Sequence, residues 1–385
     1  MEFSVLRSDF IDYLGKIVNL ARDYKGPKPM LRNVLLDLNE ERLKMVSSNE
    51  ESEMVISVPV NLIRTVSVGS VAVPAASLFD ICKVDLSKLN KTAEDLINFK
   101  FDDVSGKMLI TRLGNSYEVN CDNPDLYPSC TKVTTKNCFD VTEADLIDIL
   151  NATSFSMGVN DCRVFLNGMN MRFDGQNIVF LSSDSHRLSC YKYTLLDAEK
   201  NDSKTGVIVA RNGIMTLRKL LTPSDSKVTV SFGKNHAQFD TEKFSFLTKL
   251  IDGTCIDPDN CFPPESQIKA TFKVDREMLM AAVKSITVIC RSSDFNKIIM
   301  EIDESKITLS TTNGSHEQAN VTVPVENFDG KPEKIALNYN YLMDVLTCIP
   351  SKYVNYAYTK TSSLISPVES SNYCEEKFIV MLVKL

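Results

Sequence analysis

The tripeptide Asp184-Ser185-His186 places a carboxylate, a hydroxyl and an imidazole side by side, the groups that a nucleophilic hydrolase needs. The members of a catalytic triad usually meet through folding, so adjacent positions favour a plain turn after a strand. The other histidines are His236 and His316, and the sequence has no HExxH, paired CxxC, G-x-S-x-G or glycine-rich phosphate loop. We therefore predict a non-catalytic protein with no metal site and no cofactor. A hydrolase that uses Asp184 and His186 is the catalytic alternative.

The composition is that of a globular protein with a small acidic excess. Of the 385 residues 43% are hydrophobic, and 43 basic residues against 50 acidic ones give a net charge of −7. The sequence begins without the features of a signal peptide, and no apolar run reaches the roughly 18–20 residues of a membrane span. Its eleven cysteines are scattered and odd in number, so we expect reduced thiols in a cytoplasmic protein. The charge alone argues against a tight DNA binder.

One sequence pattern occurs three times: Phe-x-Val followed by a helical apolar stripe, beginning at Phe3, Phe139 and Phe272. The stripe falls at i, i+1 and i+4 in each copy, which is one face of a helix. Thr142 and Asp275 stand where the helix N-caps belong in the second and third copies. Later segments recur in the same order, with a strand at 43–49, 178–184 and 307–313, and a strand running into a helix at 71–82, 207–220 and 335–346.

The spacing of these anchors predicts three domains. Anchors in the first two copies lie 135 or 136 residues apart, which is the length of a whole domain. Each copy reads as helix, strands, helix, strands, and this order predicts an α+β fold with antiparallel sheets and the helices on one face. We place the domains at 1–128, 129–264 and 265–385, with polar connectors near 122–138 and 252–268.

Two motifs in the second copy carry a family resemblance. RVFLNGM (163–169), followed by SDSHRL (183–188), resembles the R-x-x-L-N-G and T-D-[GS]-H-R-L patterns of the bacterial DNA polymerase III beta subunit. MEFSV at the start, PMLRN (29–33), KLIDG (249–253) and the final VMLVKL are similar to other parts of that family. The resemblance covers essentially the full length. It implies three DNA-clamp-type domains, with sheets outside and two helices per domain inside, in a head-to-tail homodimeric ring around double-stranded DNA.

A ring that slides needs weak phosphate contacts that do not depend on base sequence, and topology then retains it on DNA. An acidic protein can work in this way if basic residues gather on the inner helices. The resemblance implies DNA contacts at Lys25, Asn160, Arg163 and Phe165, although the family often has Arg at the first position and an aromatic residue at Val164. Basic residues on or near the predicted helices are further candidates, or else ordinary solvated side chains: Arg7, Lys16, Arg22, Lys83, Arg211, Arg218, Lys219, Arg276, Lys284 and Arg291.

The family binds its partners through an apolar groove between the second and third domains, which accepts a short linear peptide. The matching positions are Leu166, Ser183, His186, Arg187, Leu188, Ile256, Cys261, Asn338, Tyr341, Ser363, Ile379, Val380, Met381, Leu382, Val383, Lys384 and Leu385. This sequence departs from the family pattern at Ile256, Asn260, Cys261 and Leu382, which keeps the groove apolar and changes its shape. Taken without the resemblance, the carboxyl-terminal run also fits a plain last strand.

Positions that match the family's dimer interface are Tyr117, Val119 and Ile289, each of which could also be an ordinary core residue. The resemblance implies a DNA sliding clamp, the processivity factor of a DNA polymerase holoenzyme. Its partners would be the replicative polymerase, the clamp loader, other clamp-binding repair or replication proteins, and a second copy of the chain. A protein-interaction scaffold with no DNA role is the non-catalytic alternative.

Overall fold

The computed structural model describes residues 1–86, 95–128, 133, 137–195, 206–290, 296–312, 318–370 and 374–385, without the side chains of 289 and 290. They form two compact units. Unit 1 contains Met1–Glu143 and Ser224–Lys249, and unit 2 contains Ala144–Pro223 and Leu250–Leu385. No helix in the described ranges is long and apolar enough to cross a membrane.

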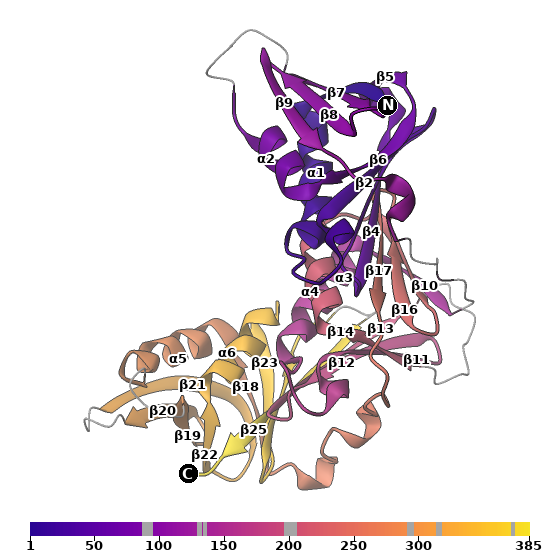
Figure 1. Ribbon diagram of the computed structural model, residues 1–385. Helices are drawn as coiled ribbons and strands as arrows, with labels where there is room; N and C mark the ends of the chain where they lie inside the picture. Colours follow the sequence, from indigo (N-terminus) through magenta and orange to yellow (C-terminus); the bar gives the residue numbers. More distant parts are fainter. Residues whose placement is uncertain are drawn as a thin grey trace. The chain divides into compact units, whose positions relative to one another are not determined.

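The first repeat lies in unit 1 and is coloured indigo to purple in Figure 1. Its elements are β1 (Glu2–Leu6), α1 (Arg7–Arg22), β2 (Asn33–Leu38), β3 (Arg42–Ser48), β4 (Ser52–Pro59), β5 (Ile63–Ser67), β6 (Gly69–Pro74), α2 (Ala75–Lys83), β7 (Leu96–Asp102), β8 (Lys107–Arg112) and β9 (Asn115–Asn120). The predicted apolar stripe, with Phe10 and Leu14, is the buried face of α1. That helix packs on β3, β4 and α2, so it covers one face of the sheet.

The second repeat is divided between the two units. Its elements are β10 (Cys138–Thr142), α3 (Glu143–Thr153), β11 (Gly168–Asp174), β12 (Asn177–Ser183), β13 (Arg187–Thr194), β14 (Gly206–Ala210), α4 (Arg211–Leu220), β15 (Lys227–Phe232), β16 (His236–Asp240) and β17 (Phe244–Lys249). Strands β10 and β15 to β17 belong to unit 1, whereas β11 to β14 and α4 belong to unit 2.

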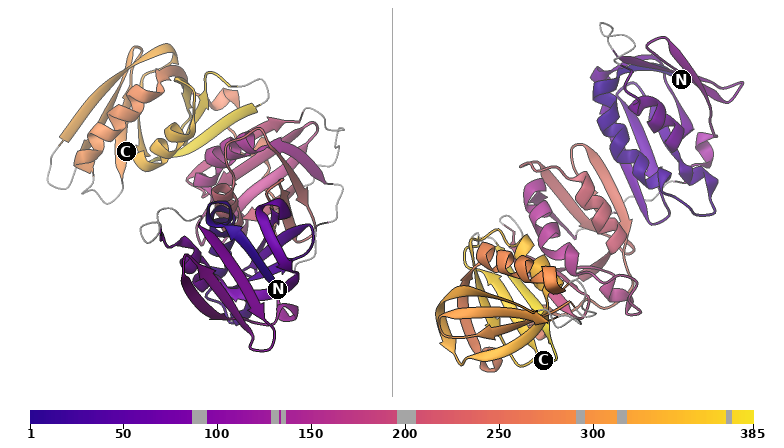
Figure 2. Two further views of the ribbon diagram at one scale, coloured as in Figure 1. Left: turned by 90° about the horizontal axis from the view of Figure 1, so that it is seen from above. Right: turned by 90° about the vertical axis from the view of Figure 1, so that its left-hand side faces the viewer.

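The third repeat lies in unit 2. Its elements are β18 (Ala270–Asp275), α5 (Arg276–Cys290), β19 (Lys297–Ile302), β20 (Lys306–Thr312), β21 (Gln318–Gly330), β22 (Glu333–Asn338), α6 (Tyr339–Cys348), β23 (Tyr353–Tyr358), β24 (Ser362–Pro367) and β25 (Cys374–Val383). The predicted cap at Asp275 is confirmed, because its carboxylate accepts a hydrogen bond of 2.9 Å from the Met278 N–H. Helices α5 and α6 lie side by side (Figure 1), and the strands curve around α5 (Figure 2).

The three repeats share one antiparallel strand pattern. The strand before the first helix pairs with the strand after the second helix in each copy: β1 with β7, β10 with β15, and β18 with β23. The strands after the first helix form the same series, β2–β3–β4, β11–β12–β13 and β19–β20–β21. The predicted α+β repeat, with antiparallel sheets and helices, is therefore confirmed.

Neighbouring repeats are joined by strand pairing. The last strand of the second repeat, β17, pairs with β4 of the first repeat and completes an eight-stranded sheet in unit 1. The last strand of the third repeat, β25, pairs with β13 of the second and completes a twelve-stranded sheet in unit 2. Each joint is thus a continuous backbone hydrogen-bond ladder.

A buried arginine of β8 fastens the end of α2 to the strands that follow it in the first repeat. Arg112 is 1% exposed, and its guanidinium donates two hydrogen bonds of 2.6 Å to the Asp95 carboxylate. It also donates to the carbonyl oxygens of Cys82 and Val84 at the end of α2. Because these carbonyls have no partner within the helix, the arginine both caps α2 and neutralises the carboxylate.

Candidate functional site

The joint between β13 and β25 in unit 2 carries a compact apolar cluster. Its buried members are Val179, Leu181, Leu188, Cys190 and Ile379, and the partly buried Ile256, Cys261, Phe262 and Leu364 pack against them. The strand register explains the grouping, since Leu181 lies opposite Cys190, and Leu188 lies opposite Ile379. Side chains that face each other in antiparallel strands share one face of the sheet. We call these nine residues the apolar cluster.

Four of the predicted groove residues meet in this cluster: Leu188, Ile256, Cys261 and Ile379. The segment that carries Ile256 and Cys261 is fixed to the sheet by polar contacts, because the Ile256 N–H donates 3.0 Å to the amide oxygen of Asn170. The Cys261 thiol donates to the Asp257 carbonyl oxygen at 3.2 Å. The first contact holds the segment against the sheet and the second fixes its own fold, so that Ile256, Cys261 and Phe262 form one wall of the apolar cluster.

A hollow of about 300 Å³ opens beside the apolar cluster. Val179, Cys190 and Phe262 form its apolar part, and charged side chains that include Lys192 and Lys377 form its rim. The Lys377 ammonium lies 5.9 Å from the centre of the Phe262 ring. An apolar floor with a polar rim is the form of a site that holds a small ligand or a peptide side chain.

The turn between β12 and β13 is built around Asp184. Its carboxylate accepts the N–H groups of His186 and Arg187 at 3.0 Å, and Ser185 takes the left-handed conformation with φ 73°. The Ser183 hydroxyl donates 2.8 Å to the Arg187 carbonyl oxygen and closes the turn. The predicted turn is therefore confirmed. The Asp184 carboxylate binds backbone and guanidinium groups, which leaves the tripeptide without the arrangement of a triad.

Arg187 links this turn to α6. Its guanidinium pairs with Asp184 at 3.0 Å and with Asp344 of α6. It also lies 4.7 Å from the centre of the Tyr341 ring and 5.3 Å from that of Phe155. Two carboxylates and two aromatic faces hold the guanidinium in one position, so the surface beside the apolar cluster is rigid.

The exposed His186 ring stacks on Tyr341, with centres 6.0 Å apart and planes at 14°. The His186 carbonyl oxygen accepts the Met381 N–H at 2.8 Å, which ties the turn to the end of β25. Apolar side chains are exposed from here to the end of the chain, with Met381 38% and Val383 40% exposed on β25 and Leu385 66% exposed after it. His186, Tyr341 and the carboxyl-terminal run thus form one continuous surface.

Three predicted groove residues lie outside the apolar cluster and make contacts within the fold. Leu166 is 3% exposed, and its carbonyl oxygen accepts the Gly158 N–H. Asn338 caps α6 through its side chain. Ser363 is fully buried and accepts a hydrogen bond of 2.6 Å from the Tyr356 hydroxyl.

The sequence reasoning missed Val179, Leu181, Phe262 and Leu364. The first two lie on β12, whose residues from Ile178 to Ser183 are all buried, so alternation could not separate its faces. Phe262 could have been predicted from the sequence, because an aromatic residue in the largely polar 252–268 connector indicates a buried contact. Leu364 had none, since its place depends on β24 pairing with β25.

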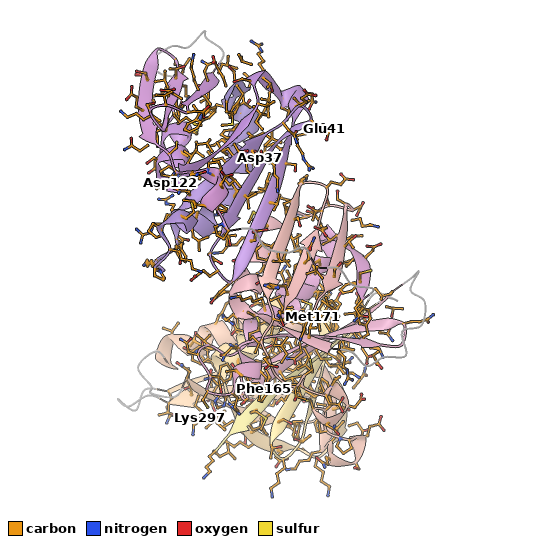
Figure 3. All side chains as sticks on the ribbon, turned by 45° about the vertical axis from the view of Figure 1, so that its right-hand side comes forward. Asp37, Glu41, Asp122, Phe165, Met171 and Lys297 are labelled. Carbon is orange, nitrogen blue, oxygen red and sulfur yellow. The ribbon has the colours of Figure 1, made fainter. Side chains whose placement is uncertain are left out.

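The residues matched to DNA contacts fall in two places, described separately. Lys25 is exposed just after α1. Asn160, Arg163 and Phe165 belong to a segment of unit 2, in which Asn160 has φ 54° and Arg163 forms an ion pair of 2.8 Å with Asp161. Phe165, labelled in Figure 3, is half-buried on the short turn Val164–Leu166. The Arg163 guanidinium holds the pKa of the Asp161 carboxyl well below its usual range.

Two basic candidates have a clear structural task. Arg7 donates to the carbonyl oxygens of Cys82 and Lys83 at 2.9 and 2.8 Å, and Arg276 donates to that of Leu346 at 3.2 Å. Both arginines stand at the start of the first helix in their repeat and bind the carboxyl-terminal end of the second. This placement satisfies carbonyls that a helix end leaves free. Their guanidinium groups therefore hold the helix pairs together.

Other basic candidates are also engaged. Arg211 donates 2.9 Å to the Met157 carbonyl oxygen, and burial together with Arg187 lowers its pKa. The Arg22 guanidinium and the Lys83 ammonium lie 5.8 and 5.3 Å from the centre of the Phe79 ring. In unit 1 these two cations lie over the same ring, near the ends of α1 and α2.

The residues matched to a dimer contact lie on an edge strand. Tyr117, half-buried, and Val119, 8% exposed, belong to β9, the last strand of the five-stranded sheet. The side chain of Ile289 and the basic candidate Arg291 lie outside the described residues. Among the described residues, no group of three or more His, Cys, Asp or Glu side chains could hold a metal ion.

Three family profiles match the chain in succession. The DNA polymerase III beta subunit N-terminal domain matches residues 1–130, the central domain 140–257 and the C-terminal domain 259–380. The beta sliding clamps of Pseudomonas aeruginosa and Haemophilus influenzae are 27% and 26% identical over 387 residues, covering 100% of both chains in each case.

The solved structures agree with these matches. The P. aeruginosa sliding clamp bound to griselimycin has a TM-score of 0.89 and 25% identity, with 100% of both chains covered. The sliding clamp from Bacillus subtilis has a TM-score of 0.91 over 100% of this chain and 99% of that one, at 16% identity, and therefore shows the shared fold alone.

Proposed function

The chain belongs to the bacterial DNA polymerase III beta subunit family, the beta sliding clamps, and we propose which of its residues close the ring, face DNA and bind partners. The family's members are non-catalytic subunits that associate with themselves, with DNA and with the polymerase. The proposal divides the chain into clamp domains at 1–128, 129–264 and 265–385. It places the protein in the cytoplasm, with the clamp loader and other repair or replication proteins among its partners.

The β17–β4 and β25–β13 pairings within the chain indicate how two copies of the chain would pair with each other. Ladder positions equate Tyr117 with Phe246 of β17 and Phe378 of β25. Phe246 lies opposite Met54 of β4, and Phe378 lies opposite Ser189 of β13. The same position is therefore aromatic in all three repeats and faces the third strand of its series in the two joints that exist within the chain.

The third strand of the remaining series is β21. Its Ala319 lies opposite Thr311 of β20, just as Met54 lies opposite Ser47 of β3. In the proposed dimer, Tyr117 of one copy faces Ala319 of the other, and β9 and β21 form the missing antiparallel pair. Strand β21 pairs with β20 over Gln318–Pro324 and with β18 only from Val325 onward, so among the described strands its first half has one side open for the edge strand β9 of the other copy. Pairing of these strands closes a head-to-tail ring and covers backbone groups that would otherwise invite aggregation.

A pair of cysteines tests this register. The double variant Tyr117→Cys, Ala319→Cys should form a covalent dimer on mild oxidation, because directly opposed strand residues have the separation that a disulfide needs. Peptide mapping identifies the bond against the native cysteines. The matched control Lys107→Cys, Ala319→Cys moves the first thiol to β8 and should give no such dimer. Equal crosslinking of both pairs would contradict the register.

Contacts with DNA are proposed at Lys25, Asn160, Arg163 and Phe165, supported by the exposure of Lys25, Asn160 and Arg163. Helix α3 has no basic residue, and several basic side chains of the other helices cap or stack within the protein. This supports weak phosphate contact, with retention by topology. A net charge of −7 is compatible with that mechanism.

The experiment loads the dimer onto nicked circular DNA with a clamp loader and separates bound from free protein by gel filtration. We expect retention on the circle and rapid loss after one restriction cut, because a ring slides off a free end. Protein that stays on linear DNA, or that leaves intact circles within minutes, would argue for ordinary affinity binding or for a scaffold without a DNA role.

Partner peptides are proposed to bind across the apolar cluster, His186, Tyr341 and the exposed end of β25. The support is the rigid turn at Arg187 beside an apolar floor and a hollow of about 300 Å³. The structure of a related clamp contains bound griselimycin. We propose that this chain binds that compound at its own apolar cluster. Titration of griselimycin into wild type and Leu188→Asp, followed by calorimetry, should show binding that the variant loses.

A further inference from the structure

Unit 1 contains a second hollow, of about 520 Å³, in the joint between β4 and β17. Its floor is formed by five residues on three adjacent strands: Val46 of β3, Glu53 and Val55 of β4, and Ser245 and Leu247 of β17. We call it the unit 1 hollow. Its size lies within the roughly 300–1,000 Å³ that ligand pockets span.

The repeat makes this hollow the counterpart of the apolar cluster. Val46 of β3 occupies the same ladder position as Leu181 of β12, because each lies one residue before an equivalent serine, Ser47 or Ser182. By the same register Val55 corresponds to Cys190, and Leu247 corresponds to Ile379. The floor of both sites is thus built from the outward face of the same three strands of the fold.

The wall of the unit 1 hollow is also fixed. Tyr127 is 8% exposed, and its hydroxyl accepts the Ser48 N–H at 3.1 Å and donates to the Asn33 carbonyl oxygen at 3.2 Å. The Asn33 amide in turn donates 2.7 Å to Asp122, labelled in Figure 3. The Tyr127 ring is therefore held in place by its own hydrogen bonds and forms an aromatic wall beside Val46.

The rim of the unit 1 hollow separates charge by position. Arg42 and Lys44 project from the β3 side, and neither forms an ion pair with another described residue. Asp240, Glu242 and Lys243 line the opposite side, at the turn between β16 and β17, which leaves that side with a net negative charge. Gln238 holds the Asp240 carboxylate with bonds of 2.9 and 2.8 Å. The β3 side is basic and the opposite side is net acidic. Between them the lining combines Val46, Val55 and Leu247 with Glu53 and Ser245.

We propose that the unit 1 hollow binds a linear segment of a partner protein that carries an acidic end, a large apolar anchor and a basic end. The apolar side chain rests on Val46, Val55 and Leu247, and the acidic end lies over Arg42 and Lys44. Opposite charges at the two rims fix the orientation, as charge complementarity does at protein interfaces. The inference stands on the unit 1 hollow and is independent of the role proposed for the apolar cluster.

The test uses the full-length dimer and fluorescein-labelled seven-residue peptides, with two acidic residues first, then two leucines and a phenylalanine, then two lysines. Anisotropy titrations at low salt should give saturable binding. Replacing the acidic end by lysines should weaken it about tenfold, as should the protein variant Arg42→Glu, Lys44→Glu. The variant should regain affinity for the lysine-ended peptide. Lys234→Glu, a surface charge reversal outside the unit 1 hollow, is the matched control and should change nothing.

A benzophenone in place of the peptide's phenylalanine locates the site. Crosslinks mapped to 42–57 or 240–247 support the proposal. Crosslinks confined to 179–190 and 256–262 overturn it, because the peptide would then occupy only the apolar cluster of unit 2. The proposal also fails if the wild type shows no saturable binding, if the charge swap does not restore affinity, or if Lys234→Glu weakens binding as much as the rim variant.

Discussion

A carboxyl group buried at the β13–β25 joint should make the protein less stable as the pH rises. Glu376 of β25 is 8% exposed, and its Oε2 has no hydrogen-bond partner among the described residues. Burial, followed by the nearby Asp148 carboxylate of α3, raises the pKa of Glu376 to about 7 from its ordinary value of 4.5. The group is therefore neutral in the folded protein over a range in which the unfolded chain carries its charge.

The magnitude follows from linkage between protonation and folding. A pKa raised from 4.5 to about 7 corresponds to roughly 3 kcal/mol between the two protonation states. Because the pKa of Glu376 is higher in the folded protein, its protonation contributes to the free energy of unfolding. That contribution is fully present below the unfolded pKa of about 4.5 and is lost as the pH rises to about 7. Asp148, whose pKa is also raised by burial and by Asp145, acts in the same direction.

The perturbation is Glu376→Gln, which keeps the shape and removes the titration. Urea unfolding at fixed protein concentration should give nearly equal free energies for the variant and the wild type near pH 5. At pH 8 the variant should be more stable by up to about 3 kcal/mol, since only the wild type then buries a charge. The control is Glu375→Gln, whose exposed carboxylate pairs with Lys377 and should leave the pH dependence unchanged.

The other groups that face this site are Tyr191 and Tyr193 of β13 and Cys348 at the end of α6. Burial raises the pKa of Tyr191 and Tyr193, and it raises that of Cys348 as well, so none of them takes up charge between pH 5 and 8. Parallel stability curves for the wild type and Glu376→Gln over that range would refute the reasoning. So would an equal effect from Glu375→Gln.

Three further outcomes are expected. Arg112→Met should lower the free energy of unfolding of unit 1 by about 3 kcal/mol, measured by urea melts, because it leaves a paired carboxylate and helix-end carbonyls without their donor. Met381→Asp should weaken binding of a clamp-partner peptide about tenfold in anisotropy titrations, because it charges an apolar contact surface, whereas Val104→Asp on an exposed turn should not. Asp184→Ala should also weaken that binding, with hydrogen exchange speeding up at His186 and Arg187 because their N–H groups lose an acceptor; unchanged exchange would contradict the role of Asp184.

Much of the fold could be predicted because the three copies preserve their helical stripes. The stripe that begins with Phe10 and Leu14 faces the core as expected. The turn at Asp184 could also be predicted, because an acidic residue followed by small polar ones after a strand favours a local side-chain hydrogen bond. Both signals can be identified from residues that lie close together in the sequence.

The rest depended on contacts between distant segments. The sequence could not show that Arg7 and Arg276 bind the ends of the second helices, because solvated and capping arginines look alike along a chain. Val179 and Leu181 could not be assigned to the site from the sequence, because β12 is buried on both faces and its polar and apolar residues do not alternate. The unit 1 hollow could not be predicted either, since Glu53 lies among apolar floor residues that come from three different strands.

The strand-paired joints also determine how the molecule carries load. The ladder of β17 with β4 runs from Phe244 to Thr248, and that of β13 with β25 runs from Arg187 to Tyr193. Hydrogen bonds pulled along the strands share the force and must break together, so such ladders resist shear. In the proposed ring the β9–β21 contact is the only ladder made between separate chains. Under tension from a moving polymerase, the ring would part at that seam and leave each subunit intact.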